Sequence, residues 1–225
     1  MANKSSVFDM IGPVMIGPSS SHTAGVVRIA RAAIRLLGGM PDEANITFYN
    51  SFARTYEGHG SDRAILGGLM DFKTDDPRIK DALEIAAEKG LIYKFKSIGN
   101  SSVHHPNTIK LNLKKGEIEM EVVGESLGGG VINIAELDGF VANFSAQNHT
   151  LIIKAGDISG AIAFISGVIA QEKTNIATMS VSRKGKNDVA CHVIEMDSGI
   201  REITAQYLKS LPWVSELIYI PDIDL

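Results

Sequence analysis

The chain has 225 residues, of which 44% are hydrophobic and 21% charged, a composition typical of a globular protein and unlike that of disordered, collagenous or coiled-coil chains. Its net charge of −4 gives no basic footprint for nucleic acid or a membrane surface. No apolar run is long enough for a transmembrane helix, and the polar start MANKSSVFDM is unlike a secretory signal, so a cytoplasmic protein is expected.

Residues 1–148 predict a mixed α/β domain. Two Gly-Pro pairs prevent residues 7–21 from forming a single helix. A helix is predicted over 22–37, with serine as its cap and Gly38-Gly39 as its stop. Apolar spacing then predicts strands at 45–50, 91–98, 108–113, 117–123, 131–135 and 139–144, and helices at 61–71 and 77–89.

Residues 149–225 predict a second domain, which begins after a short polar joint. The elements are strand 150–155, helix 159–172, strands 175–183 and 188–196, helix 200–210 and strand 214–220. This βαββαβ order is that of a ferredoxin-like fold. The predicted fold class is therefore α+β, with the domain boundary between residues 148 and 149.

The first segment that could carry chemistry is GPSSSHT (17–23), where three serines precede a predicted helix. Spare hydroxyls, free backbone N–H groups and the positive helix end suit a carboxylate or phosphate. Arg28, Arg31 and Arg35 follow on one face of this helix. The alternative interpretation is an ordinary capped helix with a solvated basic face.

Two further segments of the first domain contain histidine. In YEGHGSD (56–62), glycines on both sides of His59 predict an accessible loop that suits a general base, or else a plain turn. In VHHPNT (103–108), two adjacent histidines point in different directions and fall short of the three or four ligands that zinc needs. The single cysteine, Cys191, is expected to be a buried inert thiol and cannot hold an iron–sulfur cluster alone.

Glycines mark two other segments. Gly128-Gly129-Gly130 lacks the strand–turn–helix context of a dinucleotide site and predicts a mobile loop or a bulge. In the second domain, the loop containing Asp157, Ser159 and Gly160 opens the first helix, where Gly160 would let a small ligand approach.

The three histidine-bearing segments, in this order, resemble the β subunit of the two-subunit iron–sulfur-dependent L-serine dehydratases. The matching stretches are SVFDMIGPVMIGPSSSHTAG (6–25), SFARTYEGHGSDRAILGGLMDF (51–72), HHPNT (104–108) and SLGGG (126–130). DISGAIAFISGVIAQEKTNIATMSV (157–181) resembles an ACT domain, a module that commonly binds amino acids at dimer interfaces. The first domain resembles the allosteric substrate-binding domain of some phosphoglycerate dehydrogenases.

The resemblance implies an L-serine ammonia-lyase that forms pyruvate and ammonia without pyridoxal phosphate. A [4Fe-4S] cluster with one open iron would act as Lewis acid on the serine hydroxyl. Because this chain has one cysteine, the resemblance implies that a separate α subunit holds the cluster and that this chain holds no metal. Self-association through the ACT domain is also expected.

The matched motifs suggest site residues. The catalytic acid–base candidates are His22 and His59. Residues expected to bind substrate, or the partner's site loop, are Ser19, Ser20, Ser21, Thr23, Ser61, His105 and Asn107. The expected ligand loop of the ACT domain contains Asp157, Ser159 and Gly160. Two alternatives are a non-catalytic regulatory subunit that binds serine or another small amino acid, and an interaction subunit that only stabilises its partner.

Overall fold

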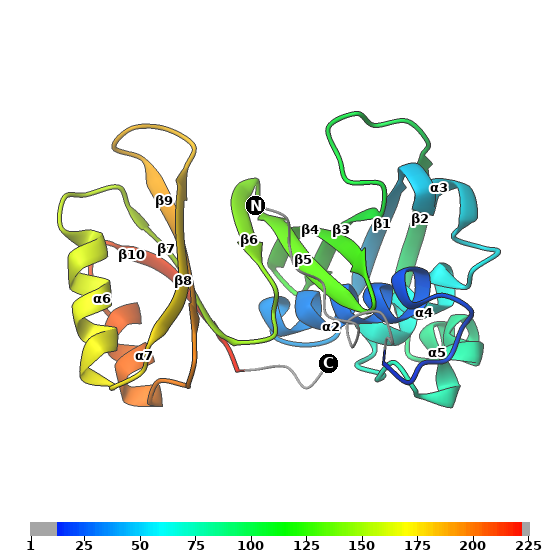
Figure 1. Ribbon diagram of the computed structural model, residues 1–225, viewed down its shortest axis with the longest axis horizontal. Coiled ribbons are helices and arrows are strands. Elements are labelled where there is room, and N and C mark those ends of the chain that lie inside the picture. Colours follow the sequence, from blue (N-terminus) through cyan, green and yellow to red (C-terminus); the bar gives the residue numbers. More distant parts are fainter. Residues whose placement is uncertain (1–12, 222–225) are drawn as a thin grey trace. The chain divides into compact units, whose positions relative to one another are not determined.

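A computed structural model describes residues 13–221 of the chain (Figure 1). The first seven residues of the stretch 6–25, which carries part of the resemblance, lie outside the described residues. The chain forms two compact units that divide between Asp138 and Gly139. The predicted domain boundary after residue 148 lies further along the chain than this division.

The elements of the first unit follow the predicted order. Its helical segments are η1 (Ser20–Ala24), α2 (Gly25–Leu37), α3 (Asn50–Thr55), α4 (Ser61–Leu69), η2 (Pro77–Asp81) and α5 (Ala82–Glu88). Its strands are β1 (Glu43–Tyr49), β2 (Ile92–Ile98), β3 (Thr108–Lys115), β4 (Ile118–Gly128) and β5 (Val131–Leu137). Only α3 has no counterpart among the predicted elements, because six residues are too few to show a helical period.

These strands form a six-stranded sheet in the order β2-β1-β3-β4-β5-β6, with β6 (Phe140–Phe144) at its edge. Strand β1 runs parallel to β2, whereas the pairs β1–β3, β3–β4 and β4–β5 are antiparallel. Helix α2 packs on β3, β4 and β5, and α4 packs on α2. The beginnings of both helices are therefore held by one core.

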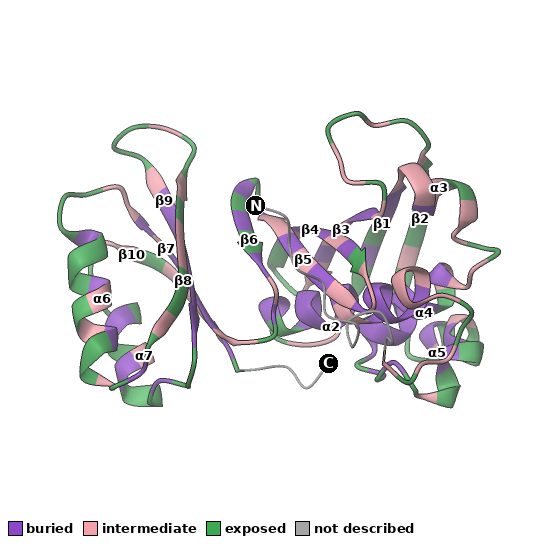
Figure 2. Cartoon of the chain, viewed as in Figure 1, coloured by how far each residue is buried: buried purple, intermediate pink, exposed green. Residues whose placement is uncertain are grey.

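Helix α2 is buried along almost its entire length (Figure 2). Small residues bring it close to α4: a Cβ added at Gly68 would lie 2.5 Å from the side chain of Ala30 and from the carbonyl oxygen of Val27. The helix ends at Gly38, whose φ of +83° is favourable for glycine. The predicted stop of this helix is confirmed.

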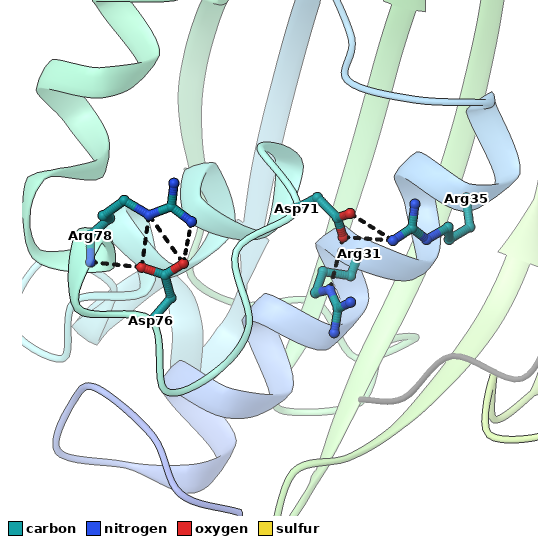
Figure 3. A network of polar contacts seen from close by, with 5 residues as sticks. All are labelled: Arg31, Arg35, Asp71, Asp76 and Arg78. Atoms are coloured by element: carbon teal, nitrogen blue, oxygen red, sulfur yellow. Dashed lines mark hydrogen bonds and ion pairs between the residues drawn. The ribbon is translucent and has the colours of Figure 1, made fainter.

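A buried arginine ties α2 to the end of α4 (Figure 3). The Nε atom of Arg31, whose side chain is only 6% exposed, donates to the carboxylate of Asp71 at 3.0 Å. Arg35 donates to both oxygens of Asp71, at 2.8 and 2.7 Å. Burial by itself would raise the pKa of Asp71, but hydrogen bonds from Arg31 and Arg35 hold that pKa below its usual value. The basic face of this helix is thus not simply solvated, because Arg31 is a structural residue.

The second unit contains the predicted βαββαβ arrangement. After β6 (Phe140–Phe144), its elements are β7 (His149–Gly156), α6 (Ala161–Gln171), β8 (Ile176–Arg183), β9 (Val189–Met196), α7 (Glu202–Lys209) and β10 (Val214–Ile220). The strand order is β10-β7-β9-β8, with every neighbouring pair antiparallel. This order and connectivity confirm the ferredoxin-like prediction and the α+β fold class. One face of the sheet packs its apolar side chains against Ile165 and Ile169 of α6 and Leu208 of α7.

The opposite face of this sheet is partly covered by β6 and the residues after it. The hydroxyls of Ser180 and Ser182 on β8 donate to the backbone carbonyls of residues 142 and 141, at 3.1 and 2.8 Å. On β9, the buried carboxylate of Glu195 accepts hydrogen bonds from the hydroxyl and the backbone N–H of Ser145, at 2.8 and 3.1 Å. These contacts show that the face of the sheet opposite the helices is also covered in part.

Candidate functional site

The first motif forms a π-helical turn, η1, that leads directly into α2. Single π turns are rare and often occur at functional sites. Ser19 caps the turn and accepts the backbone N–H of His22 at 3.3 Å. Before it, Gly17 has a φ of +133°, and a Cβ at this position would collide with the side chain of Thr23. The Gly-Pro entry therefore folds tightly against the turn that carries His22.

Two of the three serines interact with the His22 ring. The Oγ atom of Ser21 lies 2.9 Å from Nδ1 of His22, and the Oγ atom of Ser19 lies 3.4 Å from the same nitrogen. The two hydroxyl oxygens are 3.2 Å apart. The hydroxyls of Ser19 and Ser21 thus lie at a helix start and also form hydrogen bonds with each other and with the His22 ring.

The structure brings His22 and His59 together. Their ring centroids are 4.9 Å apart, with the planes tilted by 48°. Nε2 of His22 and Nδ1 of His59 are both buried and have no hydrogen-bond partner among the described residues. Burial lowers the pKa of His22, and the neighbouring His59 lowers it further. His22 is therefore expected to be neutral near pH 7.

Two hydroxyls join the segments that carry these histidines. Ser61, at the first position of α4, is fully buried and donates to the carbonyl oxygen of His22 at 2.7 Å. Thr23 donates to the carbonyl oxygen of His59 at 3.5 Å. Gly60 precedes α4 with a φ of +69°, which lets the chain turn directly after His59. Both hydroxyls were expected to bind substrate. In the structure each donates to the backbone carbonyl of a histidine and so joins the two segments that carry the imidazole rings.

A cleft of about 250 Å³ adjoins His59. Thr23, Gly58 and Gly60 line it together with three charged side chains, Glu57, Arg63 and Lys80. Sequence reasoning missed Arg63 and Lys80, although Arg63 follows the GHGSD motif directly. Two cations beside an imidazole suit a small substrate that carries a carboxylate.

The third motif lies in a loop that Asn50 holds in place. The side-chain amide of Asn50 donates to the carbonyl oxygens of Ser101 and His104, at 3.0 and 3.2 Å, and its carbonyl oxygen accepts the N–H of Ser101 at 2.7 Å. Nδ1 of His105 accepts the backbone N–H of Asn107 at 3.2 Å. Within residues 13–221, no hydrogen bond joins His105 or Asn107 to the imidazole pair.

Ser126 connects this loop to the start of α2. The side chain of Asn107 donates to the carbonyl oxygen of Ser126 at 3.4 Å, and the N–H of Ser126 donates to Asn107 at 2.9 Å. The Oγ atom of Ser126 is buried without a partner among the described residues, and a Cβ at Gly25 would collide with it. The SLGGG motif that contains Ser126 was noted in the sequence, but Ser126 was not singled out.

In the second unit, the predicted ligand loop leads into α6. Asp157 accepts a hydrogen bond from Arg183 at 2.7 Å and one from the N–H of Asn187 at 3.1 Å. The bond from Arg183 is the main reason that the pKa of Asp157 lies below its usual value. Ser159 and Gly160 are exposed. Gly160 has a φ of +88°, and an added Cβ would meet nothing within 4 Å, so backbone conformation and not lack of space favours glycine here.

The described residues do not fit an iron–sulfur cluster. Cys191, the only cysteine of the sequence, is fully buried in β9. Burial of this thiol was predicted and is confirmed. Residues 13–221 contain no group of three or more histidine, cysteine or acidic side chains that could hold a metal ion. In the same range, no helix has both the length and the apolar character that a membrane span needs.

The profile of the family described as "Serine dehydratase beta chain" matches residues 6–136. The chain belongs to this family, which confirms the resemblance seen in the sequence.

Similar proteins carry corresponding names. "Probable L-serine dehydratase, beta chain" of Bacillus subtilis (strain 168) is 44% identical over 217 residues, which cover 96% of this chain and 98% of that protein. "L-serine dehydratase, beta chain" of Peptoniphilus asaccharolyticus is 33% identical over 88% of this chain and 89% of its own length. Among solved structures, the ACT domain of GTP pyrophosphokinase from Chlorobium tepidum covers 34% of this chain and 89% of its own, with 20% identity and a TM-score of 0.27.

Proposed function

We propose that this chain is the β subunit of an L-serine ammonia-lyase, which forms pyruvate and ammonia in an active site shared with a separate α subunit. The observation that carries the proposal is the His22–His59 pair, with two buried ring nitrogens that no described residue satisfies. An unsatisfied buried polar group costs about 1–3 kcal/mol, so a chain that keeps two of them together is expected to use them.

The reaction needs what this pair can provide. A base removes the α-proton of serine, a double bond forms between the α- and β-carbons, and the β-hydroxyl leaves as water after accepting a proton. The enamine product becomes an imine, which water hydrolyses to pyruvate and ammonia. Two adjacent imidazoles can accept one proton and donate another. Arg63 and Lys80 provide positive charge for the substrate carboxylate in the adjoining cleft.

The cofactor is proposed to lie outside this chain. The family resemblance implies a [4Fe-4S] cluster and no pyridoxal phosphate, but a single buried thiol does not fit a cluster. We therefore assign the cluster to the α subunit and derive no step through it. Enzymes of this type act on a free metabolite, which fits the expected cytoplasmic location.

Self-association through the second unit is part of the same proposal. Helix α6 contains no charged residue, yet Ile162 and Phe164 are 50% and 40% exposed. A helix that is apolar on every side is usually buried. Light scattering of the purified chain tests this: a monomer at all concentrations would remove this part of the proposal.

Purification without and with the α subunit, under anaerobic conditions, tests the enzymatic proposal. The chain alone is expected to contain no stoichiometric iron or sulfide and to release no pyruvate from L-serine. Together with the α subunit, the preparation should contain iron and sulfide and should release pyruvate from L-serine. His59→Ala should remove this turnover while the complex stays assembled. His149→Gln is the control, because His149 bonds Tyr219 in the second unit.

Three results would contradict the proposal. Iron and sulfide bound to the chain alone would overturn the assignment of the cluster to a partner. Full turnover in complexes with His22→Ala and with His59→Ala would overturn the shared site. A variant that alters only the dependence of rate on serine concentration would favour a regulatory subunit.

A further inference from the structure

Four polar contacts among Ser19, Ser21 and His22 restrict where their protons lie. Ser19 Oγ accepts the backbone N–H of His22, so its own hydroxyl hydrogen remains available for donation. The acceptors within reach are Ser21 Oγ at 3.2 Å and Nδ1 of His22 at 3.4 Å. The shortest contact of the group is the 2.9 Å between Ser21 Oγ and Nδ1.

Two arrangements of the protons are conceivable. In the first, Ser19 donates to Ser21 and Ser21 donates to Nδ1 of His22, so that every donor of the closed ring has an acceptor. In the second, Nδ1 carries the proton and donates to Ser21, and Ser21 donates to Ser19. The hydroxyl hydrogen of Ser19 then has no acceptor within this ring. In the first arrangement only Nε2 of His22 is left without a partner, whereas in the second both Nε2 and the hydroxyl hydrogen of Ser19 are left without one within this group. The first arrangement is favoured because each unpaired polar group in a half-buried site is costly.

We propose that Ser21, supported by Ser19, is a positioning residue that donates to Nδ1 of His22 and keeps the neutral ring protonated at Nε2. The catalytic meaning of this inference rests on the proposed function. His22 would then direct the N–H of Nε2, the buried nitrogen that has no partner among the described residues, toward the substrate as a hydrogen-bond donor. His59, whose ring lies 4.9 Å away, would be the member of the pair that accepts a proton.

The environment of His22 supports a neutral ring. Burial and the neighbouring His59 both lower the pKa of His22, so the tautomer and not the charge is what Ser21 controls near pH 7. The edge of the ring is fixed by Phe52, whose centroid is 4.8 Å away in a T-shaped contact. A ring that cannot turn freely has to satisfy Nδ1 with the groups beside it.

Ser20 provides a matched control. It lies between Ser19 and Ser21 in the same turn, but no hydrogen bond joins its hydroxyl to the His22 ring. Ser20→Ala removes the same atom from the same turn. It should therefore reproduce any general effect of losing a serine there without changing the partner of Nδ1.

Nitrogen NMR of the full chain with ¹⁵N-labelled histidine tests the proposal directly, with the His22 signals assigned from their loss in His22→Asn. In the unmodified chain, Nδ1 of His22 should have the shift of an unprotonated ring nitrogen and Nε2 that of a protonated one. Ser21→Ala should shift both signals toward an average of the two tautomers. Ser21→Thr and Ser20→Ala should leave them in place.

A protonated Nδ1 in the unmodified chain would overturn the proposal, even if Ser21→Ala failed to fold. Unchanged shifts in a folded Ser21→Ala chain would also overturn it. In the complex with the α subunit, Ser21→Ala should lower kcat roughly tenfold with KM little changed, and Ser21→Thr should restore it. If the unmodified complex shows no turnover, the proposed function fails, while the NMR result still decides the role of Ser21.

Discussion

The imidazole rings of His22 and His59 lie 4.9 Å apart, and each presents a buried nitrogen that no described residue satisfies. One ring stands on a π-helical turn and the other precedes α4. The hydroxyl of Ser61 holds the two segments together through the backbone of His22. A pair held this firmly, with unsatisfied nitrogens, is expected to act on something outside the chain.

The first prediction concerns the two histidines in catalysis. In the complex with the α subunit, His22→Ala and His59→Ala should each lower kcat by roughly 10²–10⁴-fold and raise KM less, because acid–base groups contribute mainly to the transition state. The double variant should lose much less than the product of the two single effects, because the rings act as a unit. Independent, multiplicative losses in steady-state kinetics would contradict this coupling.

The second prediction concerns the ion pair that ties α2 to the end of α4. Asp71→Asn should lower the free energy of unfolding by about 1–2 kcal/mol, because it removes charged hydrogen bonds to the buried Arg31. Asparagine tolerates the positive φ of this position, +63°, so backbone strain is not added. Glu119→Gln is the control, since Glu119 and Lys114 form an exposed pair at 3.8 Å and its loss should cost less than about 0.5 kcal/mol. Equal losses in urea unfolding would refute the structural role of Asp71.

The third prediction concerns His192 on β9, which is 2% exposed and has no partner among the described residues for either ring nitrogen. Burial lowers the pKa of His192, and the charge of Asp157 offsets only part of that effect. The unfolded chain therefore binds the proton more tightly. Stability should be complete above about pH 6.5 and should fall as the pH drops below that value toward the folded-state pKa.

The measurement is urea unfolding of the full chain and of His192→Leu between pH 8 and pH 5. In the acidic part of this range, the free energy of unfolding of the unmodified chain should fall by up to about 1.4 kcal/mol per pH unit more than that of His192→Leu. This difference corresponds to one proton. Parallel stability curves for the two proteins would mean that His192 does not cause the acid sensitivity.

The fourth prediction concerns the start of the second unit. A fragment of residues 139–225 should fold, whereas one of residues 149–225 should be less stable or aggregate. The shorter fragment lacks β6 and Ser145, which cover one sheet face and bond the buried carboxylate of Glu195. Ser145→Ala in the longer fragment tests the Glu195 contact alone, at an expected cost of about 1–3 kcal/mol. Equal melting temperatures of the two fragments would show that the segment 139–148 adds nothing.

The fifth prediction separates two kinds of glycine. At Gly68, where the Cβ would meet α2, Gly68→Ala should destabilise the chain and Gly68→Asn should destabilise it more. At Gly160 the space is open and φ is +88°. Gly160→Ala should lower the free energy of unfolding by about 1 kcal/mol, and Gly160→Asn should lower it less. The distinction would be contradicted if the alanine and asparagine variants ranked in the same order of stability at both positions.

Local signals in the sequence were sufficient for most of the secondary structure. The serine cap and Gly38 delimited the helix of the first motif, and the alternation of apolar residues located the strands of the second unit within about two residues of their observed ends. Caps, turns and periodicity act over a few neighbouring residues, so one chain contains this information in readable form. The family followed from the order of the serine- and histidine-bearing motifs.

Tertiary packing determined how these motifs become a site. Helix α4 approaches α2 closely only because Gly68 has no side chain, and this approach brings His59 to His22. The burial of Arg31, and the hydroxyl of Ser61 turned toward a backbone carbonyl, depend on the same contact. The sequence marks these residues by type, but whether a histidine nitrogen is solvated or unpaired depends on groups far away along the chain, which only the folded core brings together.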